Sequence, residues 1–321
     1  MRSYLEFEKP IAELEGKIDD LRALEGDEKI GVDEEIGRLQ AKAEKLLADT
    51  YESLSRWQKT LVARHASRPH FSDIVDQLMT DFVPLAGDRR YGEDAAVLGG
   101  PARFRGRSVM VIGHEKGADT QSRVAHNFGM ARPEGYRKAM RLVDMAERFG
   151  LPVITFVDTP GAYPGLGAEE RGQAEAIASS TARFLDAGVP VVASIVGEGG
   201  SGGAVALAAA DRVLMYEHSV YSVISPEGCA SILWKDQKEG SKAADAAEAM
   251  KISAQDLLEL GVIDTIVSEP VGGAHRDPRG AITSLGDAVE KALEELGQQD
   301  ATARRLARRQ KFLAIGREGL N

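Results

Sequence analysis

Cysteine is almost absent from this sequence, because Cys229 is the only one among 321 residues. A single cysteine excludes an internal disulfide and any zinc site built from four cysteines, and it is typical of a protein from a reducing compartment. We expect Cys229 itself to be a small buried apolar residue.

Positive charge is also scarce, since 40 Lys and Arg residues face 50 Asp and Glu residues and give a net charge of −10. A protein that binds nucleic acid needs a basic field over its contact surface. A nucleic-acid duplex is therefore excluded as the main partner, although a local basic patch can still bind a phosphorylated small molecule.

Long apolar runs are missing as well. The opening residues MRSYLEFEKP hold no apolar segment behind a basic start, so we expect no secretory signal. The least polar stretch, 189–210, places Gly199 and Gly203 at GxxxG spacing, but Pro190 and the surrounding glycines would break a membrane-spanning helix. The sequence predicts a cytoplasmic protein that is not inserted in a membrane.

Glycine, in contrast, is abundant. The chain contains 34 glycines, above the average usage of roughly 7%. They are unevenly spread, because five of the seven residues from Gly197 to Gly203 are glycine. The function of the protein depends on what this glycine loop does.

The chain begins with charged, helix-forming sequence up to about residue 63. Apolar residues recur there every three or four positions, and Gly26 to Asp33 interrupts them, which predicts a helical hairpin. Such a hairpin either packs on its own domain or serves as an arm at a subunit interface.

From about residue 81 short strands alternate with helices, which predicts an α/β domain. The strands Pro152–Val157 and Val189–Val192 each follow a glycine and each run into a glycine-bearing loop, Asp158–Gly165 and Gly197–Gly203. Gly150 and Gly188, just before them, fit the C′ position that ends a helix. Repeated strand–loop–helix units of this kind place both loops at the same edge of a sheet. Further expected elements are the strands 95–98, 108–112, 212–216 and 262–267 and the helices 133–149, 203–210, 243–250 and 253–260.

The tail from Asp287 is expected to form a basic amphipathic helix. It ends in Arg304, Arg305, Arg308 and Arg309, which we interpret as a solvated face.

Two motifs in the glycine loop point to a binding or catalytic side chain. Residues 197–202 fit the dinucleotide pattern G-x-G-x-x-G, with Glu217 twenty positions beyond Gly197, but the helix that follows is short. Residues 199–203 fit the nucleophile elbow G-x-S-x-G, which would make Ser201 the nucleophile of a hydrolase. Asp264 and His275 are then the acid and base in suitable order, although His275 is expected in an exposed loop.

A third interpretation uses the backbone of the loop. Consecutive glycines at a helix N-terminus expose N–H groups at the positive end of the helix dipole, where they can bind an oxyanion. One such donor stabilises a transition state by roughly 2.7–4 kcal/mol. Close packing is the alternative explanation, and we expect it to account for one or two of the five glycines.

Several long motifs resemble the α subunit of the carboxyltransferase component of bacterial and plastid acetyl-CoA carboxylase. The resemblance extends from about Tyr4 to the tail and is looser in the N-terminal helices and the last forty residues. The motifs that carry it are Asn127–Met130, Pro133–Ala139, VITFVDTPGAYPG (153–165), GEGGSGGA (197–204), YSVISPEGCASILW (221–234) and EPVGGAH (269–275).

The resemblance implies a crotonase-type fold, a spiral of ββα units. The implied domains are an N-terminal helical hairpin or arm (1–70), a carboxyltransferase domain (80–270) and a C-terminal helix (281–321). It also implies that the chain receives N-carboxybiotin from a biotin carboxyl carrier protein that biotin carboxylase loads, and that malonyl-CoA is formed for fatty acid synthesis. A β subunit would bind acetyl-CoA, carry a zinc ribbon and form an α2β2 complex with this chain.

The resemblance assigns roles to residues of the two loops. Gly202 and Gly203 match the pair whose N–H groups bind the ureido oxygen of biotin and stabilise its enolate. The walls of the carboxybiotin pocket would be Gly199, Gly200, Ser201, Gly161 and Ala162.

The basic residues and the glycine loop each allow a second interpretation. A basic group consisting of Arg132, Arg137, Lys138 and Arg141 could meet CoA phosphates or could simply keep the surface soluble. The chain could also be a non-catalytic scaffold subunit whose glycine loop merely packs.

Overall fold

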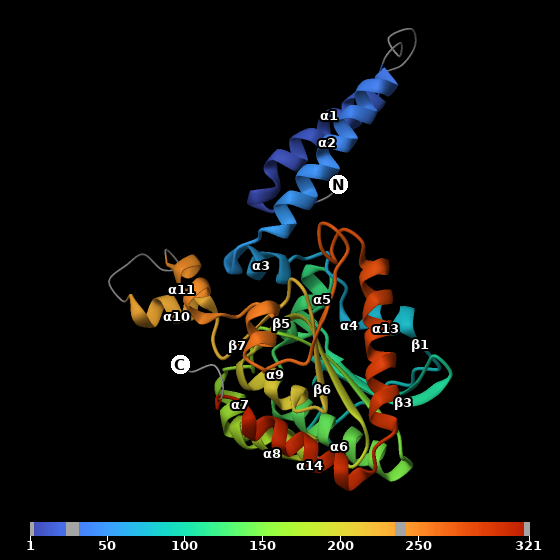
Figure 1. Cartoon of the computed structure of the whole chain (residues 1–321). Coiled ribbons are helices and arrows are strands. Elements are labelled where there is room, and N and C mark those ends of the chain that lie inside the picture. The colour runs from blue at the N-terminus through green and yellow to red at the C-terminus, as the bar shows by residue number, and fades with distance from the viewer. Residues whose placement is uncertain (1–2, 24–31, 235–241, 318–321) are drawn as a thin grey trace.

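The computed structural model describes residues 3–23, 32–234 and 242–317. The chain forms an α/β body from which a helical hairpin projects (Figure 1). The helices that precede the first strand are η1 (Glu6–Glu8), α1 (Lys9–Arg22), α2 (Val32–Glu52), α3 (Arg56–Ala63) and α4 (Phe71–Leu78).

Among the described residues, the body contains one sheet of eight strands. Its strand order is β1-β2-β3-β4-β5-β6-β8, with β7 paired to β5. Pairing is antiparallel from β1 to β3 and parallel from β3 onward. The strands are β1 (Met79–Thr80), β2 (Val97–Phe104), β3 (Arg107–His114), β4 (Val153–Thr159), β5 (Val191–Gly200), β6 (Arg212–Tyr216), β7 (Val220–Ser222) and β8 (Thr265–Val267).

The remaining helices follow or connect these strands. They are α5 (Thr120–Ala125), η3 (Asn127–Gly129), α6 (Pro133–Phe149), α7 (Leu166–Glu170), α8 (Gln173–Asp186), α9 (Ser201–Ala208), α10 (Pro226–Leu233), α11 (Ala243–Met250), α12 (Ala254–Glu259), α13 (Pro278–Gly297) and α14 (Ala301–Ala314).

Side chains of the central strands alternate between two apolar layers, as the period of two residues in a strand requires. Val153 and Ala193 pack with α6, α8 and α9 on one face, whereas Ile154 and Val192 pack with α4 and α13 on the other. Figure 1 shows these helices on opposite sides of the sheet. The central strands are thereby buried on both faces and hold their carboxyl ends in fixed positions.

The sequence predicts that glycine ends the helices before β4 and β5, and this prediction holds for α6 but not for α8. Gly150 has a φ of 64° and caps α6 in the left-handed conformation, as predicted. Gly188 does not adopt a left-handed conformation, and α8 ends at Asp186 with Ala187 as its cap. Glycine at 188 instead lets Glu147 Oε1 approach and accept from Gly188 N at 3.0 Å, since a Cβ there would lie 2.7 Å from that oxygen.

The interpretation of the C-terminal arginines as a solvated face is wrong for two of the four. Arg308 is 1% exposed, and its guanidinium donates to both carboxylate oxygens of Asp211. Arg304 is also buried and donates to the Gly188 and Leu296 carbonyls. These two arginines attach α14 to the body, while Arg309 remains exposed.

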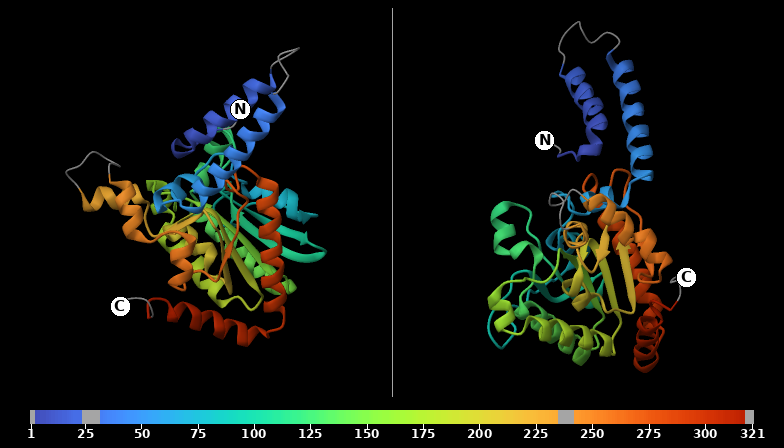
Figure 2. Two further views of the ribbon diagram at one scale, coloured as in Figure 1. Left: turned by 45° about the horizontal axis from the view of Figure 1, so that its top comes forward. Right: turned by 90° about the vertical axis from the view of Figure 1, so that its left-hand side faces the viewer.

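The N-terminal hairpin is formed by α1 and α2, which pack through Leu14, Ile18 and Ala43. The predicted interruption at Gly26–Asp33 lies for the most part outside the described residues, and α2 begins at Val32. Figure 2 shows the hairpin extending away from the sheet. Its base is joined to the body where Tyr51 donates to the buried carboxylate of Glu8 and lies 3.4 Å from His275 Nε2.

Two smaller expectations also need correction. Cys229 is only partly buried. His275 is 9% exposed and stacks on His65 with ring centroids 4.1 Å apart, so it does not lie in an exposed loop.

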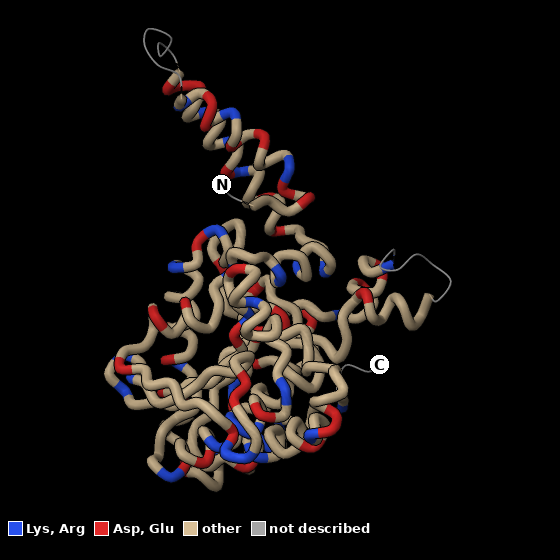
Figure 3. Tube along the Cα trace, turned by 180° about the vertical axis from the view of Figure 1, so that it is seen from behind, with Lys and Arg blue, Asp and Glu red and all other residues tan. Residues whose placement is uncertain are grey.

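The surface charges are mixed. Figure 3 shows Lys and Arg interspersed with Asp and Glu along the trace of both the body and the hairpin. Among the helices that the structure describes, none is long and apolar enough to cross a membrane.

Candidate functional site

The two glycine-bearing loops leave neighbouring parallel strands at the same edge of the sheet. In the register of β4 with β5, Thr159 lies opposite Gly199. The register shifts between Val157 and Thr159, so Asp158 occupies an irregularity in the strand. Irregularities of this kind redirect a side chain and are frequent beside active sites. The predicted adjacency of the loops is confirmed.

Close packing between the loops accounts for most of the glycines. A Cβ at Gly200 would lie 2.2 Å from the Pro160 carbonyl, and one at Gly203 would lie 2.9 Å from Ala162 N. At Gly199 it would meet the Tyr221 ring at 2.7 Å, and at Gly197 it would meet Asp158 Oδ1 at 2.4 Å. Packing therefore explains four of the five glycines, which is more than the sequence suggested.

Gly202 is the exception in this loop. A Cβ there would meet only the side chain of Ile177, at 3.3 Å from Cγ2, which a small side-chain shift could relieve. Gly202 is the second residue of α9, and the first N–H groups of a helix have no partner inside the helix. The loop thus presents backbone donors at an α-helix N-terminus, and the Ile177 side chain is the one group that a Cβ at Gly202 would crowd.

The neighbouring loop is held in shape by Thr159. Its hydroxyl donates to the Gly161 carbonyl at 2.8 Å, and Gly161 N donates to the same hydroxyl oxygen at 3.1 Å. Gly161 has a φ of 149°, a conformation that side chains disfavour. Ala162 follows directly and forms the wall that Gly203 approaches.

The hydrolase interpretation is not supported by the geometry. Ser201 is exposed and has a φ of 50°, as a nucleophile elbow would. However, Asp264 accepts from Lys311 and from Val213 N, and His275 lies against Tyr51 and His65. In the described part of the chain, no hydrogen bond joins these three residues into a triad.

The nucleotide interpretation also lacks its expected carboxylate. Glu217 accepts from the backbone N–H of Glu269 at 3.3 Å. The helix after the loop, α9, has eight residues and begins at Ser201, two positions before the predicted start.

The four basic residues proposed for CoA phosphates differ in their availability. The ammonium of Lys138 is 1% exposed and is paired with Glu93, with a further bond to the Asp94 carbonyl. The Arg137 guanidinium donates to the Arg171 carbonyl at 2.6 Å, and Arg141 donates to carbonyls of residues 85–87. The guanidinium of Arg132 lies over the Tyr163 ring, 4.7 Å from its centroid. Arg132 therefore has the fewest polar partners of the four.

A charged network beside the loops was not singled out from the sequence. Lys116 Nζ lies 2.7 Å from Asp158 Oδ1 and 3.1 Å from Glu198 Oε2, and Arg64 Nε lies 2.7 Å from Glu198 Oε1. The network borders a cavity of about 230 Å³ that also touches Pro160. Glu198 is the only charged residue between Val189 and Ala210. A lone charge in such an apolar stretch could have indicated from the sequence that Glu198 has a buried partner.

The electrostatics of this network favour the charged forms. Burial opposes the ammonium of Lys116, but the carboxylates of Asp158 and Glu198 outweigh it and raise its pKa. Burial likewise opposes ionisation of Glu198, but Lys116 and Arg64 outweigh it and lower its pKa. Lys116 and Glu198 are thus held in their charged forms by their partners.

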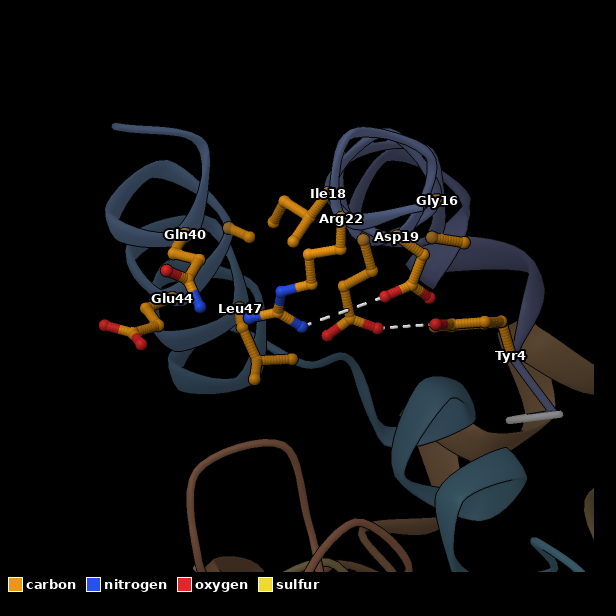
Figure 4. A pocket seen from close by; sticks show the side chains of 11 residues that line it. Tyr4, Gly16, Ile18, Asp19, Arg22, Gln40, Glu44 and Leu47 are labelled. Atoms are coloured by element: carbon orange, nitrogen blue, oxygen red, sulfur yellow. Dashed lines mark hydrogen bonds and ion pairs between the residues drawn. The ribbon is translucent and has the colours of Figure 1, made fainter. Parts of the chain in front are cut away.

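A second pocket lies far from the loops along the chain, between α1 and α2. It measures about 620 Å³, and Figure 4 shows Arg22, Asp19, Gln40 and Glu44 around it. Within the residues described, no group of three or more His, Cys, Asp or Glu side chains could hold a metal ion.

Comparison with known proteins decides the family. A family model described as acetyl co-enzyme A carboxylase carboxyltransferase-like matches residues 4–316. The chain belongs to this family. It is 63% identical over 318 residues to the acetyl-coenzyme A carboxylase carboxyl transferase subunit alpha of Azorhizobium caulinodans, with 99% of both chains covered.

Solved structures show that the fold is shared with more distant proteins. One is transcarboxylase 12S with methylmalonyl-coenzyme A bound, at a TM-score of 0.59 and 17% identity; the match covers 75% of this chain but only 45% of that one. Another is a Pseudomonas malonate decarboxylase hetero-tetramer in complex with coenzyme A, at a TM-score of 0.54 and 20% identity. That match covers 71% of this chain and 91% of the other. The predicted crotonase fold is confirmed.

Proposed function

We propose that this chain is the α half of the carboxyltransferase of acetyl-CoA carboxylase, which transfers a carboxyl group from N-carboxybiotin to acetyl-CoA. The site assignment rests on the surroundings of Gly202 and on its place in α9. Packing requires glycine at its loop neighbours, whereas a Cβ at Gly202 would meet only a movable side chain, and its N–H lies in the first turn of α9. A ligand that must approach this backbone closely explains why glycine stands there.

The N–H groups of Gly202 and Gly203 serve as an oxyanion hole. They donate to the ureido oxygen of the biotin group, on which negative charge develops as the carboxyl group leaves. The donors are fixed by the helix before the reaction begins, so they stabilise this charge without reorganising. The dipole of α9 adds to the effect because its positive end lies at the same place.

The other loop residues shape the pocket. Gly199 and Gly200 allow β5 to pass close to Tyr221 and Pro160, and Gly161 and Ala162 form the opposite wall. The Ser201 hydroxyl is a spacer with no nucleophilic role. Gly203 packs closely against Ala162 N, so the two loops meet beside the proposed oxyanion hole.

The reaction needs partners in this proposal. A biotin carboxyl carrier protein delivers the carboxybiotin after loading by biotin carboxylase, and a β subunit binds acetyl-CoA and carries zinc. Leu166 on α7 and Val205 on α9, which follow the two loops, are 75% and 39% exposed, and exposed apolar side chains beside a site are suited to such a partner. Arg132 is the residue of the basic group best placed to meet a CoA phosphate.

The experiment is reconstitution. Formation of malonyl-CoA is measured with this chain alone, with the β subunit alone and with both together, using the carboxylated carrier as donor. We expect turnover only with both chains, saturating at equal amounts. Equal turnover by the β subunit alone would contradict a catalytic role and leave the chain a scaffold.

A further inference from the structure

Lys116 follows β3, and its side chain is 18% exposed. Its ammonium contacts Asp158 and Glu198, which stand at the start of the two loops of the site. Asp158 Oδ1 also accepts from Glu198 N at 2.9 Å. One cation from a third strand therefore joins the bases of both loops.

Strand pairing also joins the loops at one point, where Thr159 of β4 lies opposite Gly199 of β5. They meet through backbone at Gly200 with Pro160 and at Gly203 with Ala162. Contacts between glycine backbones resist approach but not separation. The ion pairs of Lys116 add an attractive link between the bases of the two loops, beyond the strand pairing.

The strand irregularity at Asp158 serves this link. The break in register between Val157 and Thr159 is where the Asp158 side chain turns to accept from both Lys116 and Glu198 N. A Cβ at Gly197 would lie 2.4 Å from the same carboxylate oxygen, so Gly197 is small in order to admit it.

A second cation extends the link outward. Arg64, which directly follows α3, contacts Glu198 at 2.7 Å and Glu227 on α10 at 2.5 Å. Both oxygens of Glu198 are thereby engaged, one by Lys116 and one by Arg64. Glu198 cannot rotate without leaving a buried charge unpaired, which is costly.

We propose that Lys116 is a positioning residue for carboxyl transfer, because its ammonium sets the gap between the Asp158–Ala162 and Glu198–Gly203 loops and thereby the oxyanion hole. The inference rests on the proposed function of Gly202 and Gly203. Lys116 itself touches no reacting atom.

The test compares matched variants in the complex with the β subunit. Lys116→Met removes the link, and Lys311→Met removes a similar partly buried ion pair, with Asp264, at α14. We expect Lys116→Met to lower kcat about 10- to 100-fold, since small misplacements in a site have effects of that size. The KM for acetyl-CoA should stay within about twofold, and Lys311→Met should leave kcat unchanged.

A double variant separates positioning from stability. Lys116→Met/Asp158→Asn balances the charge, and the carbonyl of the introduced amide can still accept from Glu198 N. We expect it to recover the Tm lost by Lys116→Met but not the kcat. Recovery of both would overturn the proposal, because the role of Lys116 would then be charge balance alone.

Hydrogen exchange gives a readout that does not need activity. In Lys116→Met the amides of Thr159, of residues 161–163 and of residues 199–203 should exchange about tenfold faster, with α6 unchanged. Unchanged exchange in the loops would overturn the proposal even if the wild-type complex transfers carboxyl groups. Faster exchange in a wild-type complex that transfers none would support the link while contradicting the proposed function.

Discussion

Substitutions of Ser201 can test the strain of its backbone separately from any role of its hydroxyl in catalysis. Its φ of 50° is unfavourable for a residue with a Cβ, by about 1 kcal/mol. Its side chain is exposed at the mouth of the loop. Ser201→Gly is therefore expected to raise the free energy of unfolding by up to about 1 kcal/mol, measured by urea denaturation.

The hydroxyl of Ser201 gives a second prediction. Because the backbone carries the chemistry in our account, Ser201→Ala should retain most of the transfer activity in the assembled complex. A labelled fluorophosphonate should also leave the wild-type chain unmodified. Loss of turnover by several orders of magnitude in Ser201→Ala would instead indicate a nucleophile.

Residues of the site were only partly predictable from the sequence. The glycines could be identified because they are clustered and follow a strand. The pairing of Lys116 with Asp158 and Glu198 could not, since it joins positions 42 and 82 residues apart through the sheet. The burial of His275 was missed because its loop is rich in glycine, whereas its ring packs against His65 and Tyr51.

At the scale of elements, α14 shows that an amphipathic pattern does not determine which charged side chains of a helix become buried. The sequence predicts a basic helix, but it does not tell which arginines find carbonyl and carboxylate partners. Residues 133–149 and 212–216 form a helix and a strand with the predicted bounds, because proline and glycine mark the helix ends and a short continuous apolar run marks the strand. Such local signals fix elements, and contacts between distant segments fix their attachment.

Arg308 is predicted to be the main anchor of α14. Its side chain is fully buried and donates to Asp211 and to the Phe184 and Ala187 carbonyls. Arg308→Met leaves the Asp211 carboxylate without its buried partner, so we expect a loss of about 3–5 kcal/mol in the free energy of unfolding.

The exposed neighbour provides the control. Arg309→Met on the same helix should change stability by less than about 0.5 kcal/mol in the same urea titration. Equal effects of the two substitutions would show that α14 is not held by its buried arginine.

The junction of the hairpin with the body is expected to respond to pH. Burial, together with His65 and Arg68, lowers the pKa of His275 to about 3, while Glu269 acts in the opposite direction. The unfolded chain takes up this proton at the ordinary pKa of about 6.5. The contribution of His275 to stability is thus present above pH 6.5 and is lost as the pH falls from 6.5 toward 3.

Substitution of the ring tests this prediction. His275→Phe can keep the stacking on His65 but cannot bind a proton, so its stability should fall less steeply with decreasing pH in that range. Urea unfolding at several pH values between about 7.5 and 5 measures the slopes. Parallel slopes for the two proteins would rule out His275 as the titrating group.

At the scale of the whole molecule, the apolar side chains beside the loops indicate a covered face. Leu166→Asp should weaken association with the β subunit, because Leu166 is 75% exposed on the helix that follows the first loop. Leu313→Asp on α14 is the matched control, at 54% exposure. Analytical ultracentrifugation of the mixtures measures the effect, and equal weakening by both substitutions would contradict this location of the interface.

In the proposed reaction, backbone N–H groups at the start of α9 stabilise an oxyanion. The most direct measurement is kcat for malonyl-CoA formation by the complex carrying Gly202→Val, compared with Gly37→Val, a helical glycine with open space around it. We predict a loss of about 10²- to 10³-fold for Gly202→Val, with the complex intact, and no change for the control. Turnover of the Gly202→Val complex within about twofold of the wild type would contradict the oxyanion-hole assignment.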